Sequence, residues 1–235
     1  MSRGPHPDDR RLFAAAQVSL LRRATAEVSW LLGRGYSIAT AVAAAGNHHQ
    51  LEQRQRVAVT RAAAGDLDRD RRRTRVRRAV EAAGQHLSID GFNLLIALEV
   101  ALGGGVLVRG REGALRDLAG LRGTYHIVEE TGRALDLAGE ALAVAPPARV
   151  EILLDRAVSN SGRLKQLIEE RAAAWPFPCS VELVPDPDPI LAARDWIVSG
   201  DAVILDGRGP WVNLAGEIVE ARVPGAWIVD LSTDV

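Results

Sequence analysis

Apolar residues near the start of the chain recur every three or four positions, which is the spacing of one face of an α-helix. The pattern predicts helices over residues 10–33, 37–45 and 51–64, and a glycine follows each apolar pattern. Gly46, with Asn47, is expected to stop the second helix. These elements indicate a small all-helical module with no sign of a strand.

From His86 onward, short β-type apolar runs alternate with helical stretches. The predicted strands cover residues 87–89, 106–108, 150–154, 181–184, 196–198 and 227–229. The predicted helices cover residues 94–102, 124–144, 161–174, 189–194 and 212–220. This alternation predicts an α/β domain with a mostly parallel, three-layer sheet structure. The strand near residue 200 could occupy 195–199 or 201–205, and the first is preferred because a helix over 189–194 would naturally precede it.

A highly charged segment, residues 66–78, joins the two patterns. Its composition favours a helical connector, which Gly84 is expected to break. We therefore predict two domains: a helical module with a basic connector over residues 1–83, and an α/β domain over residues 84–235.

Composition narrows the class of protein. Of the 235 residues, 47% are apolar and 25% are charged, which excludes a disordered chain. No apolar run is long enough for a membrane span, and residues 1–11 lack the apolar core of a secretory signal. Cys179 is the single cysteine, which excludes an internal disulfide or a thiolate zinc cluster and fits a cytoplasmic protein. The sequence leaves a homo-oligomer open.

The net charge of −1 hides an asymmetry between the two halves. Residues 1–85 hold 16 arginines and 8 acidic residues, a balance of about +8, while residues 86–235 have a balance of about −9. A basic half suggests a polyanionic partner, with RNA favoured, and the acidic half is where a cation site is expected. The arginines over 71–78 could contact a nucleic-acid backbone, or they could form a solvated helix face paired with acids of the other domain.

An aspartate follows each of four predicted strands. These candidate catalytic and metal-binding residues are Asp90, Asp155, Asp188 and Asp201. Because the site of an open α/β sheet lies at the carboxyl ends of its strands, we expect the four side chains to meet there. Such carboxylates could hold Mg²⁺ or Mn²⁺ and orient a water for attack on a phosphodiester. The alternative for each is a helix cap or a turn, above all in the turn-like segment 186–189.

Two further groups of polar residues are candidates for binding substrate. Asn93 could buttress Asp90 or contact a phosphate, or it could merely cap a helix. Ser159, Asn160, Ser161 and Arg163 surround a predicted helix start, where backbone N–H groups could bind a phosphate oxygen. The alternative for this loop is simple capping.

Other conspicuous residues have structural interpretations. The glycines at 103–105 follow a helix and so indicate its end rather than a dinucleotide loop. Adjacent His48 and His49 cannot both face one metal ion from a helix and are interpreted as part of a turn. The core is expected to include Trp30, Trp196 and Trp227.

Several stretches resemble known families. Leu-Leu-Gly-Arg-Gly-Tyr at 31–36, Gly-Asn-His-His-Gln-Leu at 46–51 and Gln-Arg at 55–56 resemble the uncharacterised family called domain of unknown function 434. Residues 89–95, 116–120, 123–125 and 159–164 resemble the module usually attached to it, and neither resemblance implies an activity.

A fold-level resemblance to PIN and NYN nuclease domains starts from Asp-Gly-Phe-Asn at 90–93. In those domains, acids at strand ends bind Mg²⁺ or Mn²⁺ and cut RNA, and Asp155, Asp188 and Asp201 would match them. Their helical acid would correspond to Glu99 or Glu129.

The hypothesis that combines these observations is a metal-dependent ribonuclease whose basic helical module grips RNA. One alternative is a non-catalytic module that binds RNA or a nucleotide, with a helical part that docks a partner. Another is a small-molecule phosphotransfer or hydrolase site that uses the loop at 159–163.

Overall fold

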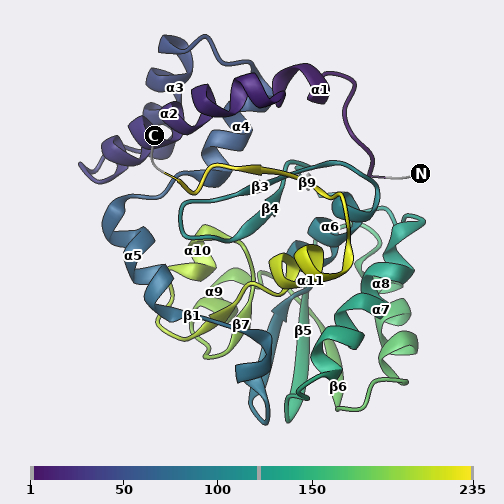
Figure 1. Cartoon of the computed structure of the whole chain (residues 1–235). Helices are drawn as coiled ribbons and strands as arrows, with labels where there is room; N and C mark the ends of the chain where they lie inside the picture. The colour runs from purple at the N-terminus through teal and green to yellow at the C-terminus, as the bar shows by residue number, and fades with distance from the viewer. Residues whose placement is uncertain (1–2, 121–122, 234–235) are drawn as a thin grey trace.

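The helical module forms the first part of the fold. The computed structural model describes residues 3–120 and 123–233 (Figure 1). The helices are α1 (Asp9–Leu12), α2 (Ala15–Leu32), α3 (Ile38–His48), α4 (Gln53–Ala62) and α5 (Asp66–Arg75). The predicted first helix is broken at Phe13 and Ala14, where the backbone of Ala14 is extended. Gly46 does not stop α3 but lies buried inside it, against the side chain of Arg56.

Six parallel strands form the main sheet. They are β1 (Val76–Arg77), β2 (His86–Asp90), β5 (Arg149–Asp155), β6 (Cys179–Val184), β7 (Ile197–Val198) and β8 (Trp211–Val212). Their order across the sheet is β1-β8-β7-β2-β5-β6. The preferred strand over 195–199 is confirmed by β7, and residues 202–205 are helical instead. The sequence missed β1 and β8, which have two residues each and show no alternating pattern.

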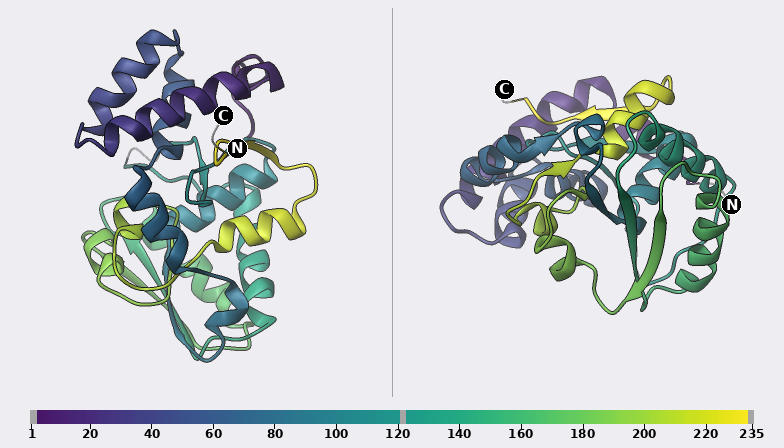
Figure 2. Two further views of the ribbon diagram at one scale, coloured as in Figure 1. Left: turned by 60° about the vertical axis from the view of Figure 1, so that its left-hand side comes forward. Right: turned by 90° about the horizontal axis from the view of Figure 1, so that it is seen from below.

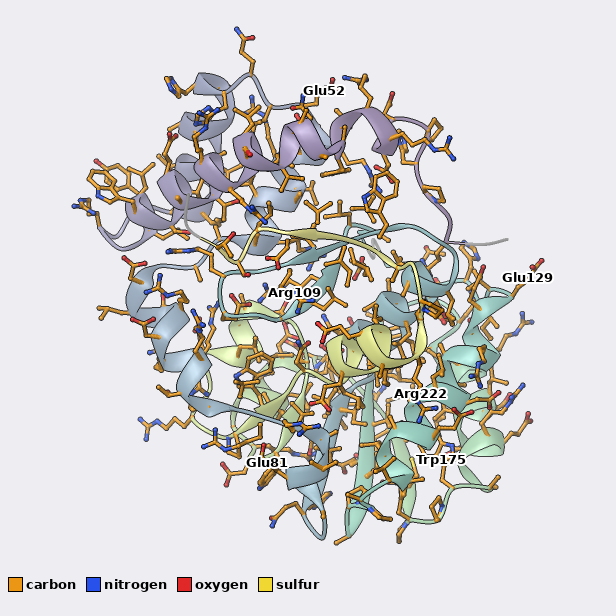
Figure 3. All side chains as sticks on the ribbon, viewed as in Figure 1. Glu52, Glu81, Arg109, Glu129, Trp175 and Arg222 are labelled. Carbon is orange, nitrogen blue, oxygen red and sulfur yellow. The ribbon has the colours of Figure 1, made fainter. Side chains whose placement is uncertain are left out.

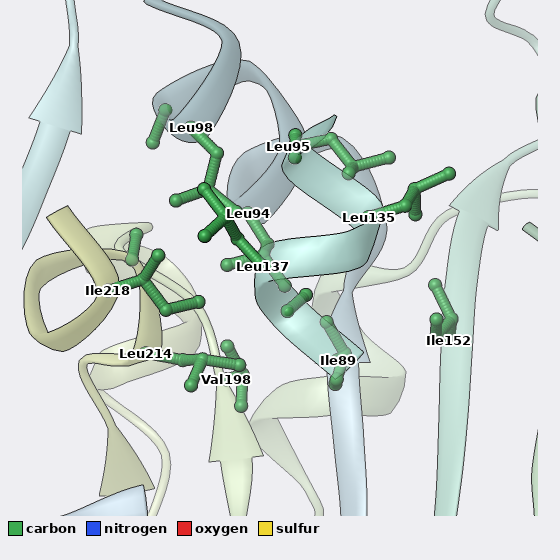
Figure 4. Close-up of a cluster of buried hydrophobic side chains, with 14 of the residues drawn as sticks. Ile89, Leu94, Leu95, Leu98, Leu135, Leu137, Ile152, Val198, Leu214 and Ile218 are labelled. Atoms are coloured by element: carbon green, nitrogen blue, oxygen red, sulfur yellow. The ribbon is translucent and has the colours of Figure 1, made fainter. Parts of the chain in front are cut away.

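Helices cover both faces of this sheet (Figures 1 and 2). One layer contains α6 (Gly91–Leu102), α7 (Glu130–Ala143), α8 (Ser161–Ala172) and α11 (Leu214–Arg222). The short helices α9 (Asp188–Ala192) and α10 (Ala202–Leu205) pack on the other face. Successive side chains of β5 point to opposite faces of the sheet. Ile152 and Leu154 belong to the core under α6 and α7, whereas Leu153 belongs to the core under α9 and α10. Figure 4 shows the first core, and this is the three-layer α/β architecture that the sequence predicts.

A small second sheet connects the two parts of the chain. It contains β4 (Leu115–Asp117), β3 (Val106–Arg109) and β9 (Trp227–Asp230), with β3 antiparallel to β4 and parallel to β9. Leu107 and Leu115 share the core of α6, whereas Val106 and Val108 share the core of the helical module. The helical module therefore packs on the outer face of this sheet.

The connector is helical only in part. The predicted helix is confirmed by α5, but the chain then forms edge strand β1 and a 3₁₀ turn, η1 (Ala79–Ala82), before Gly84 at φ +70°. The helix predicted from residue 124 begins later, at Glu130. No helix of the described residues is long and apolar enough to cross a lipid bilayer.

Gly91 lets α6 start directly against strand β5. A Cβ atom at this position would lie 2.6 Å from Leu154 Cδ2 and 2.8 Å from Ile152 Cγ2. We expect Gly91→Ala to lower the free energy of unfolding by about 1–3 kcal/mol, because the core must shift. Urea denaturation measures this, and Gly162→Ala in α8, where a Cβ meets nothing within 4 Å, is the matched control. If the two variants have equal free energies of unfolding, the core accommodates the added methyl group of Gly91→Ala without cost.

Candidate functional site

Asp90 lies at the carboxyl end of central strand β2 and at the start of α6. One carboxylate oxygen accepts a hydrogen bond from the backbone N–H of Asn93 at 3.2 Å, and the other accepts one from Ser199 Oγ at 3.0 Å. The residue is only 8% exposed. Asp90 therefore caps the helix, as the structural alternative proposed, and also faces a hollow at the edge of the sheet.

The hollow has a volume of about 210 Å³ and a strongly acidic lining. Its charged residues are Arg61, Asp90, Asp117, Asp155, Asp186 and Asp188. Three of the four predicted aspartates thus line one hollow where β2, β5 and β6 end side by side. This is the edge at which open α/β sheets bind their ligands.

The fourth predicted aspartate, Asp201, lies beside the hollow rather than in its lining. It caps α10 by accepting a hydrogen bond from the N–H of Val203 at 2.8 Å. Its charge nevertheless acts on both Asp90 and Asp188. Asp155 has a comparable local role, since one oxygen accepts a bond from the N–H of Ala157 at 2.7 Å.

Burial and mutual repulsion shape the protonation of these acids. Burial raises the pKa of Asp90 to about 7, although its two hydrogen bonds oppose the shift, and the charges of Asp188 and Asp201 add to it. Burial, followed by the charges of Asp201, Asp186 and Asp155, also raises the pKa of Asp188. Such a cluster favours the uptake of protons or of a cation.

Asp117 is a member of this cluster that the sequence analysis did not single out. It ends β4 and is 6% exposed, and burial raises its pKa, against the opposing charge of Arg61. Its Oδ1 atom has no hydrogen-bond partner among the described residues, whereas backbone N–H groups, including that of Ala119, act on the carboxylate and oppose the rise of its pKa. The available signal was its place in the 116–120 stretch that resembles the attached module, but β4 is too short to be predicted.

Asn93 and Ser199 tie the neighbouring strand to Asp90. Asn93 Oδ1 accepts a hydrogen bond from the N–H of Gly200 at 2.7 Å, so this residue buttresses the turn after β7 and does not cap a helix. Ser199 Oγ, which donates to Asp90, accepts from the N–H of Asp201 at 3.0 Å. The position of Asp90 is therefore fixed by two elements.

The loop at 159–163 lies outside the lining of the hollow. Asn160 has φ +67° and its side-chain amide donates to the carbonyl of Tyr125 at 2.7 Å, instead of capping α8. Ser159 bridges to Thr124, and Ser161 is buried, while Arg163 is exposed. The loop fastens residues 124 and 125, and its substrate-binding role stays a prediction.

Neither candidate for a helical acid lines the hollow. Glu99 is fully buried, accepts hydrogen bonds from Tyr125 and Thr131, and pairs with Arg3. Glu129 is exposed at the start of α7, at the periphery of the molecule in Figure 3. Glu99 therefore has the structural role of a buried, fully partnered carboxylate.

The arginines of the connector mostly bind within the chain. Arg71 and Arg72 pair with Asp206 of the α/β domain, and Arg75 donates to the carbonyl groups of Leu205 and Gly209. This agrees with the alternative in which the basic stretch pairs with acids of the other domain.

The fold and its acidic hollow define a parallel α/β protein with a helical N-terminal module. Residues 79–217, more than half of the chain, match the family described as "Domain of unknown function (DUF5616)", and the chain belongs to that family. Residues 20–75 match the family described as "Protein of unknown function (DUF434)", which confirms the resemblance of the N-terminal motifs.

A relative named "Uncharacterized protein MJ0935", from Methanocaldococcus jannaschii, is 28% identical over 202 residues. The match covers 85% of this chain and 97% of the relative. No solved structure matches the chain significantly. None of these names states an activity.

Proposed function

We propose that the protein is a divalent-metal-dependent nuclease that acts on RNA, with its site at the acidic hollow. The observation that carries the proposal is that Asp90, Asp155 and Asp188 line one hollow at the sheet edge, together with a buried Asp117 oxygen that lacks a hydrogen-bond partner among the described residues. The resemblance of Asp-Gly-Phe-Asn at 90–93 to PIN and NYN nucleases supports it.

The donor set fits a hard cation such as Mg²⁺ or Mn²⁺. Carboxylate oxygens are the ligands these ions prefer, and an unpartnered buried oxygen is costly without a positive partner. Among the described residues, no three of these aspartates bring oxygens within 4.8 Å of one another. This spacing favours an ion that keeps several waters and binds few carboxylates directly.

The residues have separate roles in this proposal. Asp90 and Asp117 are buried and would hold the ion, while the half-buried Asp155 and Asp188 complete the acidic lining. A bound ion supplies an activated water and neutralises charge on the phosphate. Arg61 is the cationic side chain in the acidic lining and would meet a phosphate oxygen.

Calorimetry with Mn²⁺ and Mg²⁺ tests the metal site, and cleavage of a short single-stranded RNA tests the activity. Wild-type protein should bind Mn²⁺ and cut the RNA only when the ion is present. Asp117→Asn should weaken Mn²⁺ binding at least tenfold, whereas Glu129→Gln, a change at an exposed acid, should not. If wild-type protein binds no Mn²⁺ at millimolar concentration, or if Asp117→Asn cleaves as well as wild type, the proposal fails. Salt-dependent RNA binding without cleavage would instead support the non-catalytic alternative.

Arg61 offers a prediction that separates substrate binding from metal binding. We expect Arg61→Gln to weaken RNA binding by about tenfold and to reduce the salt dependence by about one phosphate contact, because one cation is lost. Mn²⁺ affinity should stay equal or rise, since a positive charge leaves the acidic hollow. Filter binding over a series of salt concentrations measures this, with Arg149→Gln as the comparison, because Arg149 is exposed at the start of β5, away from the hollow. If the salt dependence of RNA binding is the same in Arg61→Gln and wild type, Arg61 does not contact an RNA phosphate.

A further inference from the structure

A second group of potential metal ligands lies in the helical module. Glu27 of α2, His48 at the end of α3 and the following His49 each offer one ligand atom, and these atoms lie within 4.8 Å of one another. No other trio of His, Cys, Asp or Glu in residues 3–120 and 123–233 does so. The expected turn is confirmed, because α3 ends at His48 and His49 follows it, so the argument against one helix presenting both rings does not apply here, and α2 adds a third group.

The three side chains are already in contact in pairs. His49 Nε2 lies 2.9 Å from Glu27 Oε2. The rings of His48 and His49 meet edge-on, with their centroids 4.7 Å apart. The Glu27–His49 hydrogen bond does not include His48. This bond therefore does not explain why His48 lies beside the other two side chains.

The turn that carries the histidines is held firmly. Gln50 has φ +52°, and the N–H of Leu51 donates to the carbonyl of Gly46 at 2.8 Å, which closes the end of α3. Arg56 of α4 fixes this turn by donating to the carbonyl of Leu51 at 2.9 Å and to Asn47 Oδ1 at 3.0 Å. The ligands are thus presented by a rigid turn beside α2.

We propose that Glu27, His48 and His49 form a binding site for Zn²⁺. Two imidazoles and one carboxylate suit zinc and its neighbours, whereas Mg²⁺ prefers oxygen ligands alone. Ligands of a tetrahedral zinc lie about 3.3 Å apart, so the 2.9 Å pair is near its final spacing. Exposed Glu27 and His48 can rotate to complete the set. Three protein ligands leave a fourth position for water or an added group.

An apolar hollow of about 560 Å³ borders this site. Its lining is Ala26, Glu27, Trp30, Leu31, Ala44, Ala45 and His48. Trp30 is 56% exposed, which contradicts its expected place in the core, and the guanidinium of Arg34 lies 3.4 Å from the centre of its ring. Because Trp30 shares this hollow with two of the ligands, its fluorescence should report zinc binding.

Titration of the untagged full-length protein with ZnCl₂ in a calorimeter tests the proposal. In an excess of Mg²⁺, which is meant to occupy the acidic hollow, wild-type protein should bind one Zn²⁺ per chain at the helical module with micromolar affinity, because Mg²⁺ should not compete for imidazole ligands. His48→Ala and Glu27→Gln should each weaken the site at least tenfold. His126→Ala removes another exposed histidine and should leave the affinity unchanged. Asp90→Asn should also retain Zn²⁺, which separates this site from the acidic hollow.

The Zn²⁺ titrations test the site in the helical module independently of the acidic hollow. Absence of Zn²⁺ binding by the wild type at 100 µM would overturn the proposal, as would equal affinity in wild type, His48→Ala and Glu27→Gln. If His48→Ala fails to fold, Glu27→Gln still decides, because Glu27 is an exposed side chain on α2. Loss of Zn²⁺ in both ligand variants, with Mn²⁺ binding intact, would support two independent metal sites.

Discussion

Replacing Asp90 by Asn is expected to make the protein more stable above pH 7 while it removes divalent-cation binding at the acidic hollow. Burial raises the pKa of Asp90 from 3.8 to about 7, so the folded protein retains a proton that the unfolded chain has lost. Stability therefore falls as the pH rises from about 4 to 7. The cost reaches about 4 kcal/mol above pH 7, since each pKa unit corresponds to about 1.4 kcal/mol.

The asparagine variant lacks this cost and can keep both hydrogen bonds of Asp90. Its oxygen can accept from the N–H of Asn93, and its amide can donate to Ser199 Oγ. We expect its melting temperature at pH 8 to exceed that of wild type by roughly 10 °C and to match it near pH 4. Calorimetric melting in EDTA from pH 4 to 8 measures this.

Exposed Asp195 provides the matched control, because Asp195→Asn makes the same chemical change outside the hollow. That variant should follow the wild-type curve at every pH. Addition of Mn²⁺ at pH 8 should stabilise wild type and Asp195→Asn but not Asp90→Asn. If the melting temperatures of wild type and Asp90→Asn change in parallel with pH, ionisation of the buried Asp90 does not destabilise the folded protein.

Glu112→Gln is expected to destabilise the protein by about 3–5 kcal/mol. Glu112 is fully buried and pairs with the guanidinium of Arg116, which is 4% exposed. Arg116 also donates to the carbonyls of Gly200 and Arg61, so it joins the turn after β7 to helix α4. Glutamine preserves the shape but leaves the arginine charge buried without its counter-ion.

The comparison variant for Glu112 is Glu220→Gln. Glu220 pairs with Arg109 at the surface, and its side chain is 54% exposed, so solvent screens the pair. Loss of that pair should cost no more than about 1 kcal/mol. Urea denaturation of both variants gives the difference, and similar losses would mean that burial adds nothing to the Glu112–Arg116 pair.

The long helices and strands of this fold can be predicted from the sequence, because their buried residues recur in a regular pattern. Strand β5 buries five residues in a row, and such a run is recognisable without knowledge of its neighbours. Strands β1 and β8 have two residues each, and they are strands only because they pair with each other and β7. Tertiary pairing of this kind leaves no local signal.

The residues of the candidate sites also fall into two groups: those that the sequence pattern predicts and those that only tertiary packing brings together. Asp90 could be predicted because it closes an obvious strand before an obvious helix. Asp117 is the last residue of a three-residue antiparallel strand, and Arg61 comes from the helical module, so only the packing of the small sheet brings them to the hollow. Glu27 and His49 likewise meet across two helices, which the one-helix argument about His48 and His49 could not include.

The small sheet has a consequence for how the chain folds as it is synthesised. Strand β9 follows the helical module and most of the α/β domain along the chain, yet Val229 and Leu231 share the core of Leu21 and Val28. Arg22 also donates to the carbonyl of Asp230 at 2.9 Å. Helix α2 therefore leaves the ribosome well before β9, and part of its apolar face stays uncovered until β9 has been made. A nascent chain halted before β9 should therefore be protease-sensitive in α2 and prone to aggregate.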